Sequence, residues 1–233
     1  MKERMFEFIT KTWNPLGGEC LHKCLYCWSQ SDKGLVKMYK LKKYVGSPRI
    51  DRNVFNRKFS QDDFVFVQDM SDLLAKNILL MHIREVLFYI RKSEATFLLL
   101  TKNPVRYFEL YEQIPPNCVL GCTIESNFDF LNISKAPNQS DRLYWMTRLA
   151  DVMQITHGNK LFVAIEPILE FDLIQFFNML ANWIKPWAVA IGYDNYDNHL
   201  PEPSLAKTLQ LIDRLEKAGI TVYRKTLREA WKA

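Results

Sequence analysis

The chain has 233 residues, of which 48% are apolar, and its formal net charge is +5 at neutral pH. A chain of this length and apolar content can bury a large core, so one domain over residues 1–233 is expected. No stretch approaches the run of about 18 apolar residues that a membrane span requires, and the charged opening MKERMFEFIT lacks the apolar core of a signal peptide. These features predict a cytoplasmic protein without a membrane partner.

Short apolar segments alternate with longer segments of helical periodicity along most of the chain. Strands are expected at residues 6–12, 64–67, 96–100, 119–124, 161–165, 188–191 and 221–223. Helices are expected between them at residues 73–91, 104–112, 141–154, 172–183 and 204–218. Ser71 or Asp72 is the expected cap of the first helix, Pro104 belongs to a first turn after Asn103, and Gly219 ends the last helix. The strands are short and uniformly apolar, which indicates burial on both faces of a parallel sheet.

Serial βαβ units with right-handed crossovers predict an α/β fold, namely a full or partial TIM-like (βα) barrel with a mostly parallel sheet. The alternative is an open, doubly wound sheet. In a barrel, the residues that follow the strands meet at one mouth. Polar residues recur at these positions: Gln68, Asp69 and Ser71; Thr101 and Lys102; Glu125 and Ser126; Glu166; Asp194 and Asn195; Arg224 and Lys225. Each one alone is typical of a cap or loop, but their recurrence at the same end favours a site.

Residues 29–60 form a basic segment with nine basic side chains against only Asp32 and Asp51, a net charge of +7. The basic residues are Lys33, Lys37, Lys40, Lys42, Lys43, Arg49, Arg52, Arg57 and Lys58. Interleaved aromatic residues offer stacking surfaces, so the segment is a candidate for contact with phosphates and bases. A solvated helix and loop is the equally weighted alternative.

Three of the five cysteines, Cys20, Cys24 and Cys27, form the pattern C-x3-C-x2-C. This spacing is too short for a disulfide framework and is typical of metal binding in a reducing compartment. Three thiolates leave one iron of a 4Fe-4S cluster open to a substrate or cofactor. The alternative is a structural zinc completed by His22, His82, His157 or His199, although the paired C-x2-C motifs usual for zinc are absent.

The string CLHKCLYCW resembles the hallmark of the radical S-adenosylmethionine (radical SAM) superfamily, C-x3-C-x-aromatic-C. The resemblance implies that the three thiolates hold a 4Fe-4S cluster, that S-adenosylmethionine chelates the fourth iron, and that Tyr26 lies near its adenine. The implied activity is reductive cleavage of S-adenosylmethionine to methionine and a 5'-deoxyadenosyl radical. An external electron donor, such as a reductase, flavodoxin or ferredoxin, is the implied partner.

A closer resemblance covers nearly the whole chain. The strings TWNPLGGEC, FVQDMSDLL, TFLLLTKNPVRY and FVAIEPIL are similar to landmarks of an uncharacterised phage- and archaea-associated radical-SAM-like family, which commonly carries TWNP, MSDL, LTK-x-P and EPL. Many members of that family space the first two cysteines more widely. The superfamily's Gly-Gly-Glu after the second strand is replaced here by Gln68-Asp69-Met70-Ser71, which leaves the contact to the methionine amino group open.

The resemblance also implies roles for individual residues. Asp69 and Ser71 occupy the slot that binds the amino group, and Glu125 or Ser126 binds the ribose or the carboxylate end of the cofactor. Lys102, Glu166 and Lys225 project to the same mouth and are candidates for substrate binding or for offsetting the charge of the cofactor.

Three functional hypotheses follow. The first is a radical SAM enzyme of unknown substrate; the basic segment and a distant likeness to the spore photoproduct lyase branch, which repairs DNA, suggest a nucleotide or nucleic acid. The second is a zinc-stabilised nucleic-acid-binding protein without catalysis. The third is a barrel that keeps the cluster and acts as a partner or redox sensor. The identity of the metal separates the first two.

Overall fold

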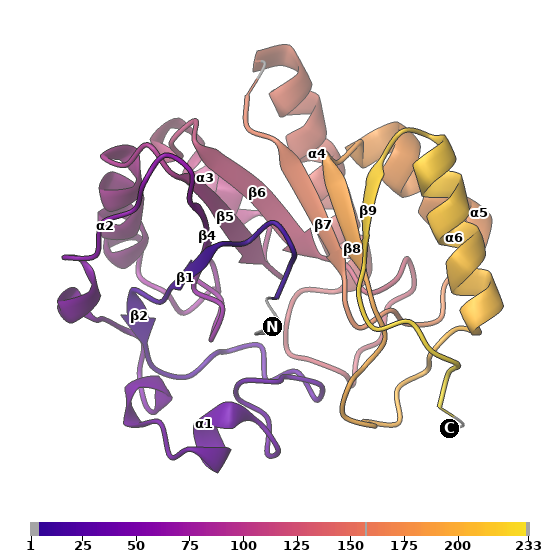
Figure 1. The fold of residues 1–233 in the computed structure, drawn as a ribbon, viewed down its shortest axis with the longest axis horizontal. Coiled ribbons are helices and arrows are strands. Elements are labelled where there is room, and N and C mark those ends of the chain that lie inside the picture. The colour runs from indigo at the N-terminus through magenta and orange to yellow at the C-terminus, as the bar shows by residue number, and fades with distance from the viewer. Residues whose placement is uncertain (1–4, 157, 232–233) are drawn as a thin grey trace.

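The computed structural model describes residues 5–156 and 158–231, and its main feature is a curled, seven-stranded sheet in the form of a half-barrel (Figure 1). The strands lie side by side in chain order: β1 (Lys11–Trp13), β4 (Phe64–Val67), β5 (Thr96–Thr101), β6 (Cys118–Thr123), β7 (Leu161–Ile165), β8 (Ala188–Ile191) and β9 (Thr221–Arg224). All neighbouring pairs are parallel. The order never reverses as it does in a doubly wound sheet, so the predicted partial TIM-like barrel is confirmed.

The crossover helices pack on the convex face of the sheet (Figure 1). They are α2 (Leu80–Arg91), α3 (Arg106–Glu109), α4 (Gln139–Thr156), α5 (Leu173–Asn178), which continues as a π-helix over Met179–Ile184, and α6 (Leu205–Lys217). Alternate strand residues, among them Val163 and Val189, pack against these helices in the larger apolar cluster. The intervening residues, among them Phe162 and Ala164, face the concave side in a smaller cluster, as the two-residue period of a strand requires.

The N-terminal segment departs from the prediction, because β1 begins at Lys11 and residues 6–9 are not part of a strand. Phe6 and Ile9 instead pack onto the concave face of the sheet. The Phe8 ring lies 4.8 Å from the ring of Phe64 on β4 and 4.8 Å from that of Tyr223 on β9. A half-barrel leaves its concave apolar side chains without an opposite wall, and these residues cover them.

The helix expected at residues 73–91 begins only at Leu80, so the expected cap at Ser71 or Asp72 is wrong. The N-cap residue is Leu79, which makes no side-chain hydrogen bond there. Helix α3 also begins two residues after Pro104, at Arg106. Gly219 does end α6, with φ of +81° in the left-handed region that favours glycine.

Residues 14–60 form a layer that the sequence did not predict. It contains the antiparallel pair β2 (Leu16–Gly17) and β3 (Arg49–Ile50), the short helix α1 (Leu35–Met38), and 3-10 turns at Lys42–Tyr44 and Arg52–Val54. This layer carries the cysteine loop to the carboxyl edge of the sheet (Figure 1). Of the helices in the described part of the chain, none has the length and apolar character needed to cross a bilayer.

Candidate active site

The residues that follow the strands converge on one cavity of about 860 Å³ at the carboxyl edge of the sheet. Strand alternation explains the convergence, since Glu166 shares the concave face with Ala164, and Lys102 shares it with Leu100. Nine of the predicted site residues line this cavity: Cys20, Cys24, Tyr26, Cys27, Asp69, Ser71, Lys102, Glu166 and Lys225. Glu125 and Ser126 do not line it.

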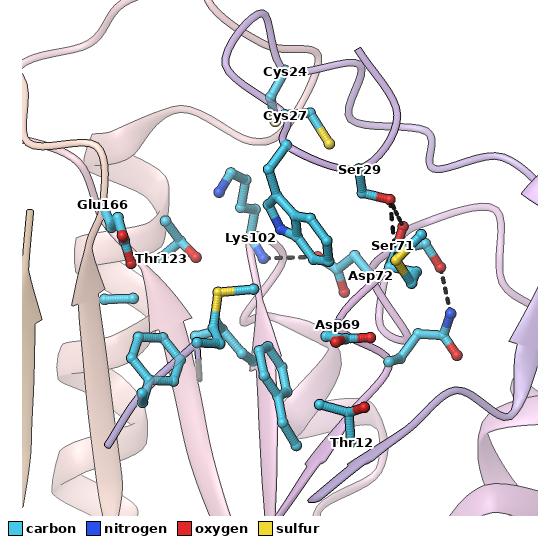
Figure 2. Close-up of a pocket in the computed structure, with 18 of the residues that line it drawn as sticks. Thr12, Cys24, Cys27, Ser29, Asp69, Ser71, Asp72, Lys102, Thr123 and Glu166 are labelled. Atoms are coloured by element: carbon cyan, nitrogen blue, oxygen red, sulfur yellow. Dashed lines mark hydrogen bonds between the residues drawn. The ribbon is translucent and has the colours of Figure 1, made fainter. Parts of the chain in front are cut away.

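The three thiols of the cysteine loop are free and partly exposed (Figure 2 shows two of them above the cavity). Burial raises the pKa of the Cys20 thiol to about 12 and also raises the pKa of Cys24. The backbone N–H of Gln30 donates to Sγ of Cys27 at 3.2 Å. Metal binding requires all three thiols to lose a proton, so metal affinity depends on pH, and the raised pKa values of Cys20 and Cys24 oppose that loss.

The donor set fits a 4Fe-4S cluster better than a single ion. Within residues 5–156 and 158–231, no three His, Cys, Asp or Glu side chains converge closely enough to bind one metal ion. The cysteines of a cluster bind different irons, so their sulfur atoms need not converge on one point. Of the histidines weighed as a fourth zinc ligand, His82 and His199 lie outside the cavity, and His157 lies outside the described residues.

The cysteine loop is fastened to the loop between β4 and α2. The side chains of Ser29 and Gln30 both donate to the carbonyl of Met70, at 2.9 and 3.0 Å. The Gln30 side-chain oxygen in turn accepts from the backbone N–H of Cys20 at 2.7 Å. These contacts fix both ends of the loop that carries the three thiols.

A buried pair, His22 and Asp72, anchors the centre of the cysteine loop. The His22 ring Nε2 lies 2.7 Å from the Asp72 carboxylate, and the residues are 3% and 7% exposed. The same carboxylate accepts from the Thr101 hydroxyl at 2.9 Å and from the backbone N–H of Lys102 at 2.8 Å. Burial tends to raise the pKa of Asp72, but the His22 ring and these hydrogen bonds lower it overall.

Sequence reasoning missed this pair, because His22 was considered only as a zinc ligand and Asp72 only as a helix cap. The available signal was the position of each residue: His22 lies between two cysteines, and Asp72 belongs to the MSDL landmark. The sequence does not indicate that the two side chains are in contact, since 50 residues separate them in the chain.

Asp69 and Ser71 lie on the wall of the cavity next to this anchor (Figure 2). Asn14 donates to the Asp69 carboxylate at 2.6 Å, and Gln68 donates to the Ser71 hydroxyl at 2.8 Å. Burial raises the pKa of Asp69. Asn14 of the TWNP landmark therefore positions a cavity residue.

Tyr26 covers a buried network of charges. Its hydroxyl donates to the Glu125 carboxylate, which is ion-paired with Arg142 of α4 at 2.7 Å and lies 3.5 Å from the ammonium of Lys102. That ammonium also lies 5.3 Å from the centre of the Tyr26 ring. Burial tends to raise the pKa of Glu125, but the two cations lower it overall. Glu125 thus holds the Tyr26 hydroxyl and the Lys102 ammonium from behind the cavity wall.

Ser126 stabilises the loop that follows β6. Its hydroxyl donates to the backbone carbonyl of Glu170 at 2.5 Å and accepts from the backbone N–H of Phe128 at 2.9 Å. The side chain is fully buried. The role in cofactor binding that the resemblance implied for Ser126 stays a prediction.

Glu166 and Lys225 lie at the end of the cavity nearest the last strands. The Lys225 ammonium donates to the backbone carbonyl of Met5 and lies 5.6 Å from the centre of the Phe6 ring. Burial raises the pKa of Glu166, with the opposing influence of Lys225 and Lys102 too small to cancel it.

More than half of the basic segment makes contacts within the protein. Lys37, Lys43 and Arg52 form ion pairs with carboxylates, and Arg49 and Arg57 donate to backbone carbonyls. The remaining basic residues, Lys33, Lys40, Lys42 and Lys58, are exposed.

Among solved structures, the fold is similar to that of a spore photoproduct lyase C140S mutant, with a TM-score of 0.63 and 12% identity over 97% of this chain and 81% of that one. It is also similar to SuiB from Streptococcus suis bound to S-adenosylmethionine, with a TM-score of 0.60 and 11% identity over 94% of this chain and 50% of that one. Identities at this level show a shared fold. Comparison with curated protein sequences gives no significant match.

The family of the protein is identified from its sequence. The model of the family described as "Protein of unknown function (DUF5131)" matches residues 3–192, which is most of the chain. The protein therefore belongs to the DUF5131 family. The match spans the cysteine loop and every strand from β1 to β8.

Proposed function

We propose that residues 1–233 form one radical SAM core and that the protein is a radical SAM enzyme. One observation carries the proposal: three free thiols on one short loop line a cavity at the carboxyl edge of a parallel half-barrel, together with Tyr26 and Lys102. The shared fold with SuiB bound to S-adenosylmethionine supports it. The alternative of a zinc-stabilised binding protein is not favoured, since no described histidine completes a four-ligand site with the thiols.

Cys20, Cys24 and Cys27 would hold the 4Fe-4S cluster, with His22 and Asp72 keeping their loop in place. When bound, the reduced cluster and S-adenosylmethionine would together supply a 5'-deoxyadenosyl radical for removal of a hydrogen atom from the substrate. The ring of Tyr26 offers a flat surface at the cavity wall for adenine. Lys102 offers a fixed cation to the carboxylate of the cofactor, and burial of its surroundings strengthens that attraction.

Asp69 and Ser71 would accept hydrogen bonds from the amino group of the cofactor. Both side chains face the cavity, and Asn14 and Gln68 hold them there. Glu125 would act through Tyr26 and Lys102, since it does not line the cavity. Glu166 and Thr123 would form the substrate end, away from the thiols (Figure 2), with Lys225 close to Glu166 across Gly192.

The test is formation of 5'-deoxyadenosine by anaerobically reconstituted protein. A strong reductant and S-adenosylmethionine should give slow formation of 5'-deoxyadenosine without any substrate, and an external flavodoxin or ferredoxin should replace the chemical reductant. The Cys24→Ala variant should form none. A fully loaded, reducible cluster that never cleaves S-adenosylmethionine would replace this proposal with that of a redox sensor.

A further inference from the structure

Glu166 differs from the other carboxyl groups that line the cavity. Asp69 accepts from Asn14 at 2.6 Å, Asp72 is held by His22 at 2.7 Å, and Asp194 accepts from the backbone N–H of Asn198 at 2.8 Å. Glu166 makes no hydrogen bond or ion pair with any residue that the structure describes. A largely buried carboxyl without a partner is costly unless a ligand supplies hydrogen-bond donors.

The space around Glu166 is kept open. Figure 2 shows Glu166 and Thr123 at the same end of the cavity, and the Thr123 hydroxyl also makes no side-chain hydrogen bond within the described residues. Gly192 lies between Glu166 and Lys225, and a Cβ there would approach the Lys225 Cβ to 2.6 Å and Oε1 of Glu166 to 3.5 Å. A larger residue at position 192 would therefore displace the side chains of this end of the cavity.

The charges near Glu166 restrict the guest to an uncharged group. Lys102 and Lys225 both act on the Glu166 carboxyl electrostatically, and neither forms an ion pair with it. Two ammonium groups repel a cationic guest such as a guanidinium. In its ionised form, the Glu166 carboxyl has no donor, and both of its oxygens accept hydrogen bonds. An uncharged group with two adjacent N–H donors satisfies both conditions.

The cavity wall next to this end is apolar. Phe6, Phe66, Leu100 and Ala164 line the same cavity on the concave face of the sheet. Leu100 is its partly exposed residue, and the other three are 1–3% exposed. Among nucleobases, guanine alone presents two N–H donors, N1–H and N2–H, side by side on an uncharged ring. Its neighbouring O6 is an acceptor for the Thr123 hydroxyl or the Lys102 ammonium.

We propose that Glu166, with Thr123 at the same end of the cavity, binds the edge of a guanine-type base, so that the substrate of the proposed enzyme contains such a base. The inference that a substrate contains this base rests on the proposed function, whereas the binding test does not depend on it. A carboxylate that accepts both N–H groups contributes the specificity, and the apolar floor contributes contact with the ring. Loss of one such hydrogen bond to a charged acceptor lowers affinity about tenfold or more.

The test compares guanosine and inosine 5'-monophosphates, which differ only in the exocyclic amino group of guanine. Calorimetric titration of protein taken through anaerobic cluster reconstitution should give about tenfold tighter binding of the guanosine nucleotide. Glu166→Gln, which keeps the shape, should reduce the preference to about twofold or less, because an amide oxygen replaces only one of the two acceptors. Glu94→Gln, on the exposed surface, should leave it unchanged.

Equal binding of the two nucleotides by folded wild-type protein would overturn the inference, as would tighter binding of N-acetylarginine amide than of either nucleotide. A preference for guanine that survives in folded Glu166→Gln or Glu166→Ala would also overturn it. Metal analysis of the same sample separates the two proposals. Protein without iron that still prefers guanine would overturn the proposed function and support this subsite.

Discussion

The Arg142 guanidinium and the Glu125 carboxylate form an ion pair of 2.7 Å in which both side chains are only 1% exposed. The pair joins α4 to the end of β6 and supports two residues of the cavity wall, because the same carboxylate accepts from the Tyr26 hydroxyl and neighbours the Lys102 ammonium. A helix on the convex face therefore determines the position of an aromatic ring in the proposed cofactor site.

Arg142→Met should strongly destabilise the protein, because it leaves the buried Glu125 carboxylate without its closest cation. Loss of one partner of a buried pair costs about 3–5 kcal/mol. Chemical denaturation measures the free energy of unfolding. Arg148→Met, which removes an exposed pair with Asp151, should cost less than about 1 kcal/mol. Similar losses in the two variants would contradict the buried network.

Asp72→Ala should loosen the cysteine loop, because the buried His22 ring, the Thr101 hydroxyl and the Lys102 N–H lose their common acceptor. We expect a loss of about 1–3 kcal/mol in the free energy of unfolding and faster release of iron to a chelator. Asp62→Ala, at an exposed position, is the matched control. Iron release at the same rate in both variants would show that the His22 and Asp72 contact does not hold the loop.

The stability of the protein should decrease between about pH 4 and pH 2 in part through Asp63, which joins β1 to β4. Burial raises its pKa, but hydrogen bonds from Lys11 and Ser60 outweigh it and lower the pKa to about 2. A lowered carboxyl pKa contributes stability above the unfolded-state pKa, and this contribution disappears as the pH falls through the folded-state value. Thermal unfolding of Asp63→Asn should thus show a weaker dependence on pH in this range. If Asp62→Asn flattened the profile equally, the assignment would be wrong.

We expect the basic segment to bind nucleic acid through its exposed lysines. Lys33, Lys40 and Lys42 form no ion pair with any residue in the described part of the chain, whereas Lys43 is held by Asp51 at 2.7 Å. Reversal of the first three to Glu should weaken binding to many sequences about equally and reduce its salt dependence, as expected of phosphate contacts. Reversal of Lys76, Lys92 and Lys185, which are also exposed, is the control. Equal binding by the two triple variants would exclude a phosphate-binding role.

The fold was predictable because its strands are short, buried apolar segments. The observed bounds of β4, β7 and β8 equal the expected ones. Residues 14–60 were not predictable, since their structure depends on contacts with the strand ends rather than on a repeating apolar pattern. Phe6 and Phe8 resemble a strand in the sequence, but their rings complete the concave face of a half-barrel, which only the assembled sheet reveals.

The position of the site was predictable from the cysteine spacing and from the polar residues after each strand. Its supporting network was not. Nothing in the sequence distinguishes Arg142 from the other polar residues of its helix. Its burial depends on the ion pair with Glu125, which lies 17 residues away in the chain and outside that helix. The same holds for His22 and Asp72, whose roles depend on a contact between distant segments.

Metal analysis of anaerobically purified protein is the direct test of whether Cys20, Cys24 and Cys27 hold an iron–sulfur cluster. We expect about four iron and four sulfide per chain with little zinc, and loss of both iron and sulfide in the triple variant Cys20→Ala, Cys24→Ala, Cys27→Ala. Cys118→Ala, in the core of β6, should retain them. One zinc per wild-type chain without sulfide, or wild-type iron and sulfide in the triple variant, would contradict the claim.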